Sequence, residues 1–75
     1  MLRVRMFRDH RQLFSGTAAQ VVLPSSEGEV AVLEFHAPML CALAEGEVQI
    51  DEQRVAVRRG IARVGSNQVT IIARG

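Results

Sequence analysis

The sequence predicts an all-β domain, a small sandwich or barrel built from short strands. Two observations carry this prediction: apolar residues recur at every second position in several segments, and short turn-forming segments separate them. The chain has 75 residues, of which 48% are hydrophobic. This length predicts that residues 1–75 form a single domain with a thin core.

The apolar alternation runs from the N-terminal segment to the C-terminal one. Val, Ile, Leu and Met occupy the alternating positions, as expected of strands that bury one face. The alternating residues are Leu2, Val4 and Met6, then Val30 and Val32, Val48 and Ile50, Val55 and Val57, and finally Val69 and Ile71. We expect each of these sets to point into the core.

Glycine, proline, serine and acidic residues predict the turns between these strands. The predicted turns or bends are Ser15-Gly16, Pro24–Gly28, Glu45-Gly46, Asp51-Glu52, Arg59-Gly60 and Gly65–Asn67. Gly16 and Gly60 interrupt strand-like runs, which predicts a bulge or a close backbone approach at each of them. A long strand that bends at such a glycine can pass from one sheet into the facing sheet.

The segment Pro38–Glu45 has a composition that also suits a helix. It is only about two helical turns long and Gly46 follows it, so we predict a buried strand or bend instead. Cys41 lies among apolar neighbours in this segment. We predict that it is a small core residue.

The charged residues fall into three blocks. Residues 1–23 contain four arginines and one acid, residues 24–52 contain seven acids and no base, and residues 53–75 contain five arginines and no acid. Two interpretations are open. Acidic and basic strands can pair across a sheet, or the acidic block can mark one end of the domain and face a basic partner.

The residue pattern argues against a catalytic or metal site. No nucleophile motif surrounds Cys41, and His10 and His36 lack the paired spacing of metal ligands. We therefore predict no enzyme activity of its own, no metal and no cofactor. No apolar run reaches the ~20 residues that span a bilayer, and a lone cysteine fits a reducing compartment. We expect a cytosolic protein that reaches a membrane only through a partner.

A stand-alone small β-barrel that binds single-stranded nucleic acid is the alternative function. The nine arginines would suit the basic groove of such a barrel. However, the three phenylalanines are scattered and seven acids occupy the middle of the chain, whereas bases stack on grouped aromatic side chains. We therefore predict no nucleic-acid partner.

Two linked motifs are more specific than the strand pattern. His36-Ala37-Pro38-Met39-Leu40 follows the turn Glu27-Gly28-Glu29 at a short distance along the chain. Supporting residues, in compatible order, are Phe14, Gly16, Val22-Leu23-Pro24, Val32-Leu33, Ala42-Leu43, Gly46, Gly60, Val64 and Val69-Thr70-Ile71. Over nearly the whole chain, this pattern resembles the N-terminal domain of the epsilon subunit of F-type ATP synthases.

The resemblance implies a flattened β-sandwich of about ten short, mostly antiparallel strands. It also implies a non-catalytic rotor subunit of the central stalk, which couples the gamma subunit to the membrane rotor ring during proton-driven ATP synthesis. Such a subunit would lie in the cytoplasm, peripheral on the inner face of the plasma membrane within the ATP synthase complex. It would not insert into the membrane directly.

The resemblance further implies two contact sites. The residues that would meet the polar loops of the rotor-ring c subunits are Ser25, Ser26, Glu27, Gly28 and Glu29. Glu29 is the main candidate, since those loops carry arginine in the family. The residues that would lie against gamma are His36, Ala37, Pro38, Met39 and Leu40, with Met39 and Leu40 supplying apolar contact. His36 itself is either such a contact or a loop residue bonded to backbone.

Three features depart from the family pattern. Glu34-Phe35 replaces the usual Pro-Gly before the histidine, and Arg59 precedes Gly60 where the family has two glycines. The chain stops after the strand-like segment Val69–Ala73, without the C-terminal helical hairpin of relatives. Because that hairpin binds ATP or extends to inhibit hydrolysis, we expect this chain to do neither.

Overall fold

The computed structural model describes residues 1–75 and contains nine strands. They are β1 (Leu2–Arg8), β2 (Arg11–Ala18), β3 (Gln20–Ser25), β4 (Gly28–Leu33), β5 (Met39–Leu43), β6 (Gly46–Ile50), β7 (Gln53–Val57), β8 (Arg59–Gly65) and β9 (Gln68–Arg74). The all-β prediction is confirmed, with nine strands where about ten were implied. The structure has no helix of the length and apolarity needed to cross a membrane.

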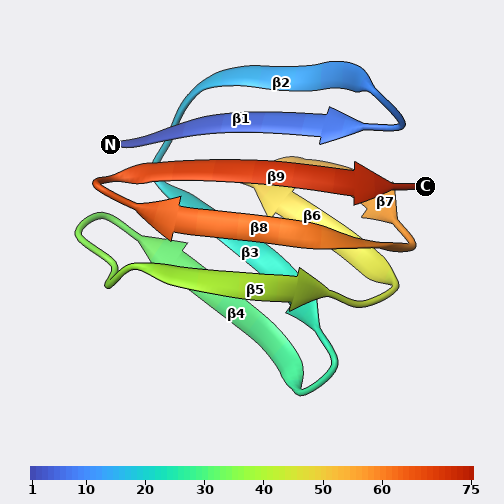
Figure 1. Cartoon of the computed structure of the whole chain (residues 1–75). Helices are drawn as coiled ribbons and strands as arrows, with labels where there is room; N and C mark the ends of the chain where they lie inside the picture. The colour runs from blue at the N-terminus through green and yellow to red at the C-terminus, as the bar shows by residue number, and fades with distance from the viewer.

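The strands form two sheets packed face to face, so the architecture is a sandwich (Figure 1). One sheet has five strands in the order β2-β1-β9-β8-β5, and the other has four in the order β4-β3-β6-β7. Neighbouring strands run antiparallel, except that β1 and β9 are parallel. The last strand therefore occupies the middle of the five-stranded sheet.

Alternate side chains of both sheets meet in a core of 17 buried apolar residues. The residues expected to point inward are buried, except that Val30 and Val55 are only partly buried. Cys41 is 8% exposed, which confirms the prediction that it is a core residue. No polar or charged side chain is buried, so apolar burial supplies the packing energy of the sandwich.

Most of the predicted turns are confirmed. Tight turns lie at Ser26-Glu27, Asp51-Glu52 and Ser66-Asn67. The turn predicted at Ser15-Gly16 is wrong, because both residues lie within β2 and pair with β1. The β1–β2 hairpin instead turns at Asp9-His10, where both residues have positive φ, 53° and 68°.

The chain crosses between the sheets through very short connections. Only Ala19 separates β2 from β3, and only Arg58 separates β7 from β8. The second crossing depends on Gly60, because a Cβ there would lie 2.4 Å from the carbonyl oxygen of Ile72. The close approach predicted at Gly60 is thus confirmed. At Gly16 it is wrong, since a Cβ would make only an ordinary 3.6 Å contact with the Phe14 ring.

The segment with helix-like composition forms an edge strand. Met39–Leu43 is β5, which pairs with β8 at the end of the five-stranded sheet. Its side chains alternate between exposed and buried, because adjacent residues of a strand point to opposite faces. The strand prediction is therefore confirmed, with one face of the strand open to solvent.

Candidate functional site

The two candidate contact segments lie at opposite ends of β4 (Figure 1). The β3–β4 turn enters this strand at Gly28, and the β4–β5 loop leaves it after Leu33. A six-residue strand spans about 20 Å. One hydrogen-bonded strand thus links two separate surfaces.

Ser25 fixes the β3–β4 turn from within. Its hydroxyl donates a hydrogen bond to the Gly28 carbonyl at 2.6 Å and accepts one from the Glu27 N–H at 3.3 Å. Gly28 has a φ of 117°, which residues with a side chain rarely adopt. Ser26, Glu27 and Glu29 are exposed. The turn therefore presents acidic side chains to solvent on a fixed backbone.

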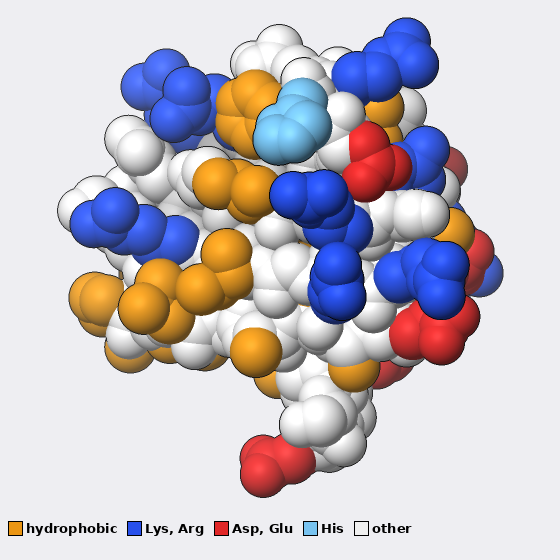
Figure 2. All heavy atoms as spheres, turned by 45° about the vertical axis from the view of Figure 1, so that its right-hand side comes forward, with side chains coloured by type: hydrophobic (Ala, Val, Ile, Leu, Met, Phe, Trp, Pro, Cys, Tyr) orange, Lys and Arg blue, Asp and Glu red, His pale blue; other side chains and the backbone are white.

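Further glutamates surround the base of this turn. An open hollow of about 640 Å³ is lined by Pro24, Ser25, Gly28, Glu29, Glu45, Gly46, Glu47, Gln49 and Arg54. None of these glutamates is in an ion pair, since the only ion pair of the molecule joins the N-terminal amine to Glu34. In Figure 2 the protruding lower tip, which is the β3–β4 end of the molecule, bears acidic side chains. This end can attract a basic partner.

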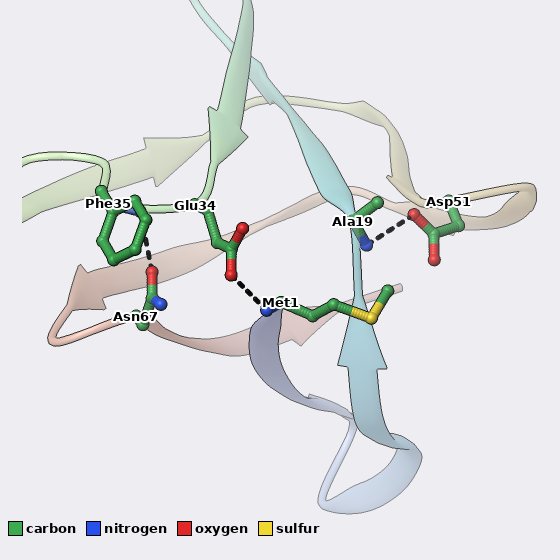
Figure 3. Close-up of polar contacts among 6 residues, drawn as sticks. All are labelled: Met1, Ala19, Glu34, Phe35, Asp51 and Asn67. Carbon is green, nitrogen blue, oxygen red and sulfur yellow. Dashed lines mark hydrogen bonds and ion pairs between the residues drawn. The ribbon is translucent and has the colours of Figure 1, made fainter.

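The β4–β5 loop begins with a turn at Glu34-Phe35 that three contacts hold in place. Figure 3 draws the contacts of Phe35 with Asn67 and of Glu34 with Met1. The Phe35 N–H donates to Oδ1 of Asn67 at 2.8 Å, and the His36 N–H donates to the Leu33 carbonyl at 3.1 Å. The N-terminal amine of Met1 contacts the Glu34 carboxylate. The loop is thus bonded to the β8–β9 turn and to the start of β1.

The His36 side chain is half-buried and bonded to its own backbone segment. Its Nδ1 donates to the Ala37 carbonyl at 2.7 Å. Because a carbonyl oxygen only accepts, this bond assigns the hydrogen to Nδ1. The ring is therefore bonded to backbone within its own loop, as one of the two open interpretations expects. A partner contact by its exposed part stays a prediction.

The rest of this segment divides between the core and the surface. Ala37 and Pro38 are exposed, and Leu40 is 69% exposed. Met39 is half-buried and packs against the core. Adjacent strand residues point to opposite faces, so Leu40 exposes most of its side chain to solvent, whereas Met39 exposes only part. Contact of either residue with a partner stays a prediction.

Acidic and basic side chains are segregated. No strand of the five-stranded sheet contains an acid. On its outer face, Arg5 and Arg63 flank Thr70 in register, and arginines occupy both members of the Arg59↔Arg74 pair. Figure 2 shows blue arginine side chains spread widely over the visible face, beside a group of exposed hydrophobic ones. Strand β6, which contains Glu47, does pair with β7, which contains Arg54, as one interpretation of the charge blocks expected. No arginine forms an ion pair, however, so this pairing does not neutralise the acidic side chains.

The His, Cys, Asp and Glu side chains of the molecule do not form a metal-binding cluster. No group of three or more His, Cys, Asp or Glu side chains lies close enough to hold a metal ion. Cys41 is a free, buried thiol. The two candidate surfaces are an acidic one at the β3–β4 turn and a largely apolar one at the β4–β5 loop and the start of β5.

Sequence reasoning missed three residues that shape the loops. Phe35 occupies a positive-φ position of the β4–β5 loop and Asn67 anchors it. Oδ1 of Asp51 accepts hydrogen bonds from the N–H groups of Ala19 and Gln20 at 2.9 and 3.2 Å, which fixes the β2–β3 crossing (Figure 3). The one available signal was the replacement of Pro-Gly by Glu34-Phe35. No local signal marks Asn67 or Asp51, because the hydrogen bonds that they accept come from Phe35 and Gln20, which lie 31 or more positions away in the sequence.

Comparison with known proteins gives consistent matches. A family model described as "ATP synthase, Delta/Epsilon chain, beta-sandwich domain" matches residues 1–75. The ATP synthase epsilon chain of Thermosynechococcus vestitus is 33% identical over 79 residues, which cover 100% of this chain and 57% of the relative. That of Gloeothece citriformis is 36% identical over 78 residues, covering 99% and 56%. The chain thus spans little more than half the length of these relatives.

Two solved structures share the fold. A chain of the Euglena gracilis mitochondrial ATP synthase, in a structure of OSCP, F1 and c-ring, has a TM-score of 0.82 at 23% identity, with coverage of 96% of this chain and 49% of that one. A chain of the Tetrahymena thermophila mitochondrial ATP synthase, in a structure of the central stalk and c-ring, has a TM-score of 0.78 at 13% identity, with coverage of 99% and 63%. Both superpose on nearly the whole sandwich.

Proposed function

Because this chain belongs to the β-sandwich family of ATP synthase delta and epsilon chains, we propose that it is a non-catalytic rotor subunit of the central stalk of an F-type ATP synthase. In this role it couples the gamma subunit to the membrane rotor ring during proton-driven ATP synthesis. The family match over residues 1–75 is the observation that carries the proposal. The resemblance inferred from the sequence motifs is thereby confirmed at the level of the family.

The β3–β4 turn is our candidate for the rotor-ring contact. Its exposed Glu27 and Glu29, with Glu45 and Glu47 behind them, form an acidic surface without internal ion pairs. The resemblance implies arginine on the polar loops of the ring. Opposite charges at the rim of an interface favour encounter and correct orientation.

The β4–β5 loop is our candidate for the gamma contact. Leu40 supplies exposed apolar surface, and Ala37 and Pro38 are exposed beside it. Since β4 separates this loop from the acidic turn by about 20 Å, two partners can bind without overlap. Membership of such a complex makes the protein membrane-associated through its partners, on the cytoplasmic face in our proposal.

Coupling two partners requires a body that does not deform between them. The hydrogen-bonded ladders of β3 and β4 and the close-packed core meet that requirement. The residues of the two loops perform no bond making. Their contribution is shape and charge at fixed positions.

Co-purification tests the proposal directly. Tagged 75-residue chain, co-expressed with a gamma subunit and separately with a rotor ring in detergent, should retain each partner through a wash at physiological salt. Bovine serum albumin and a tagged unrelated β-sandwich serve as controls. Recovery of neither partner above those controls would refute the proposal.

The arginines on the outer face of the five-stranded sheet favour the alternative, binding of single-stranded nucleic acid. That face carries a single aromatic side chain, the half-buried Phe7 in register with Ile72, because Phe14 packs against the core and Phe35 lies on the β4–β5 loop. It therefore lacks the grouped aromatic side chains on which successive bases stack. A titration with labelled oligonucleotide at several salt concentrations separates the functions. Tight binding with a steep salt dependence would favour the alternative.

A further inference from the structure

We propose that Phe35 anchors the domain to the gamma subunit by inserting its ring into an apolar pocket on that subunit. The inference rests on the proposed function, because it takes gamma as the partner of the β4–β5 loop. It adds an aromatic anchor just outside the segment His36–Leu40. Two properties of Phe35, its backbone conformation and its exposure, carry the inference.

The backbone of Phe35 adopts an unfavourable conformation. Its φ is 64°, in the left-handed region where a bulky side chain collides with its own backbone. Five other non-glycine residues have positive φ: Asp9, His10, Asp51, Ser66 and Asn67. All five are polar residues of tight turns, and most are types that tolerate this region. Phe35 is the one apolar residue among them, and strained residues of this kind concentrate at binding sites.

The ring of Phe35 contributes little packing to the fold. It is 84% exposed, more than any other large apolar residue of the molecule, and Leu40 follows at 69%. Leu33, two residues earlier on the outer face of β4, is 53% exposed. The isolated domain therefore carries the strain and the exposed aromatic surface without compensation. Burial of the ring against a partner would recover the apolar contribution.

The loop holds Phe35 in one position before any partner arrives. The Phe35 N–H is bonded to Asn67 and Glu34 contacts the N-terminal amine (Figure 3). The His36 N–H is in addition bonded to the Leu33 carbonyl. A side chain on a backbone fixed in this way loses little conformational entropy on binding. Exposed aromatic residues on rigid backbone are typical of binding hot spots.

The position of Phe35 selects gamma over the rotor ring as its partner. The acidic β3–β4 turn lies at the other end of β4 (Figure 1). When the rotor ring is bound at that turn, the other end of β4, next to Phe35, lies about 20 Å from the contact. Phe35 directly precedes His36 in the β4–β5 loop, and the exposed Leu40 follows near the start of β5. A pocket lined with apolar side chains is the chemistry that fits it.

The test compares gamma binding with thermal stability in the 75-residue chain. Phe35→Gly removes the ring and releases the strain, so we expect a Kd for purified gamma at least about tenfold higher with a Tm no lower than that of the wild type. Phe35→Asn, which tolerates positive φ, should show the same loss of affinity. Phe35→Trp should bind within about threefold of the wild type, since it keeps an aromatic anchor.

A matched control is Leu13→Ala, which truncates an exposed apolar residue of β2 and should leave the Kd unchanged. If the wild type binds gamma and Phe35→Gly binds it with the same Kd, the proposed anchor is refuted and the proposed function is unaffected. A loss of affinity with a lower Tm would also overturn it, since the fold would then be the cause. No gamma binding by the wild type would overturn the proposed function itself.

Discussion

The side chain of Asn67 holds the backbone of Phe35 in place. Oδ1 of Asn67 accepts a hydrogen bond from the Phe35 N–H at 2.8 Å across 32 residues of sequence. Both residues have positive φ, 59° for Asn67 and 64° for Phe35. The β8–β9 turn of the five-stranded sheet is thereby bonded to the β4–β5 loop, which leaves the four-stranded sheet. One amide side chain sets the position of the proposed gamma contact.

Removing this amide should loosen the loop. Asn67→Ala loses the hydrogen bond and places a methyl side chain at positive φ, so we expect the free energy of unfolding to fall by about 1–2 kcal/mol. Asn67→Asp keeps an acceptor oxygen and tolerates the same φ. Its free energy of unfolding should therefore fall by less than that of Asn67→Ala. Urea unfolding of the three proteins measures the difference. Equal stability of the alanine and aspartate variants would contradict this account.

Reversing one charge at the β3–β4 turn should weaken the rotor-ring contact. Glu29 is exposed and unpaired, so Glu29→Lys should leave the domain folded by circular dichroism. We expect ring affinity to fall severalfold, up to about tenfold, as is reasonable for an exposed charge pair. The difference should shrink at high salt, because ions screen exposed charges.

Glu52→Lys provides the control for that change. Glu52 is an exposed acid on the β6–β7 turn, outside the β3–β4 surface, and its reversal alters the net charge equally. Glu52→Lys should lower the affinity for the rotor ring less than Glu29→Lys does. A similar fall in both variants would mean that net charge, and not the β3–β4 turn, governs the contact.

Two glycine substitutions should differ sharply. In Gly60→Ala the new Cβ would lie 2.4 Å from the Ile72 carbonyl oxygen, so the β8–β9 ladder must shift. We expect a loss of at least about 2 kcal/mol of stability. Gly16→Ala places its Cβ 3.6 Å from the Phe14 ring and should change stability by less than about 0.5 kcal/mol. Melting temperatures close to each other would disprove the close approach at Gly60.

The carboxylate of Asp51 should prove structural. Asp51→Ala leaves the Ala19 and Gln20 N–H groups without their acceptor, so we expect a loss of about 1–2 kcal/mol. Asp51→Asn keeps one acceptor oxygen and should recover most of that loss. Hydrogen exchange should accelerate at the two amides in the alanine variant alone. Unchanged exchange there would count against the bond.

Neighbouring residues of β5 should separate binding from stability. Leu40 is 69% exposed, so Leu40→Ala should lower gamma affinity and leave the melting temperature nearly unchanged. Met39 packs against the core, so Met39→Ala should lower the melting temperature. If Leu40→Ala bound gamma as well as the wild type, Leu40 would not be part of the gamma contact.

The strands with one buried face were predictable from the sequence, and β2 shows where that reasoning stops. Residues such as Val4 and Ile71 alternate with exposed ones because the core selects apolar side chains at every second position. Most of β2 is exposed, with Ala18 its one buried residue. Without a buried face there is no alternation to read, so Ser15-Gly16 suggested a turn inside a strand.

The two loops were identified from motifs, but their arrangement was not predictable. Nothing local indicates that Asn67 bonds Phe35 or that the N-terminal amine contacts Glu34, because both contacts join distant residues. The placement of the loops at opposite ends of β4 follows from the strand's bounds, which the alternation of Val30 and Val32 located only approximately. Local pattern thus fixes elements, whereas tertiary contacts fix the shape of the surfaces.

The parallel pairing of β1 with β9 has a consequence for biosynthesis. β9 bridges β1 and β8, so β1 with β2 and β8 with β5 form two separate pairs until Gln68–Arg74 is available. A growing polypeptide on the ribosome can form its early hairpins, but its larger sheet joins only once Gln68–Arg74 has emerged. We expect translated intermediates to stay protease-sensitive until then, with the native state arising in one late step.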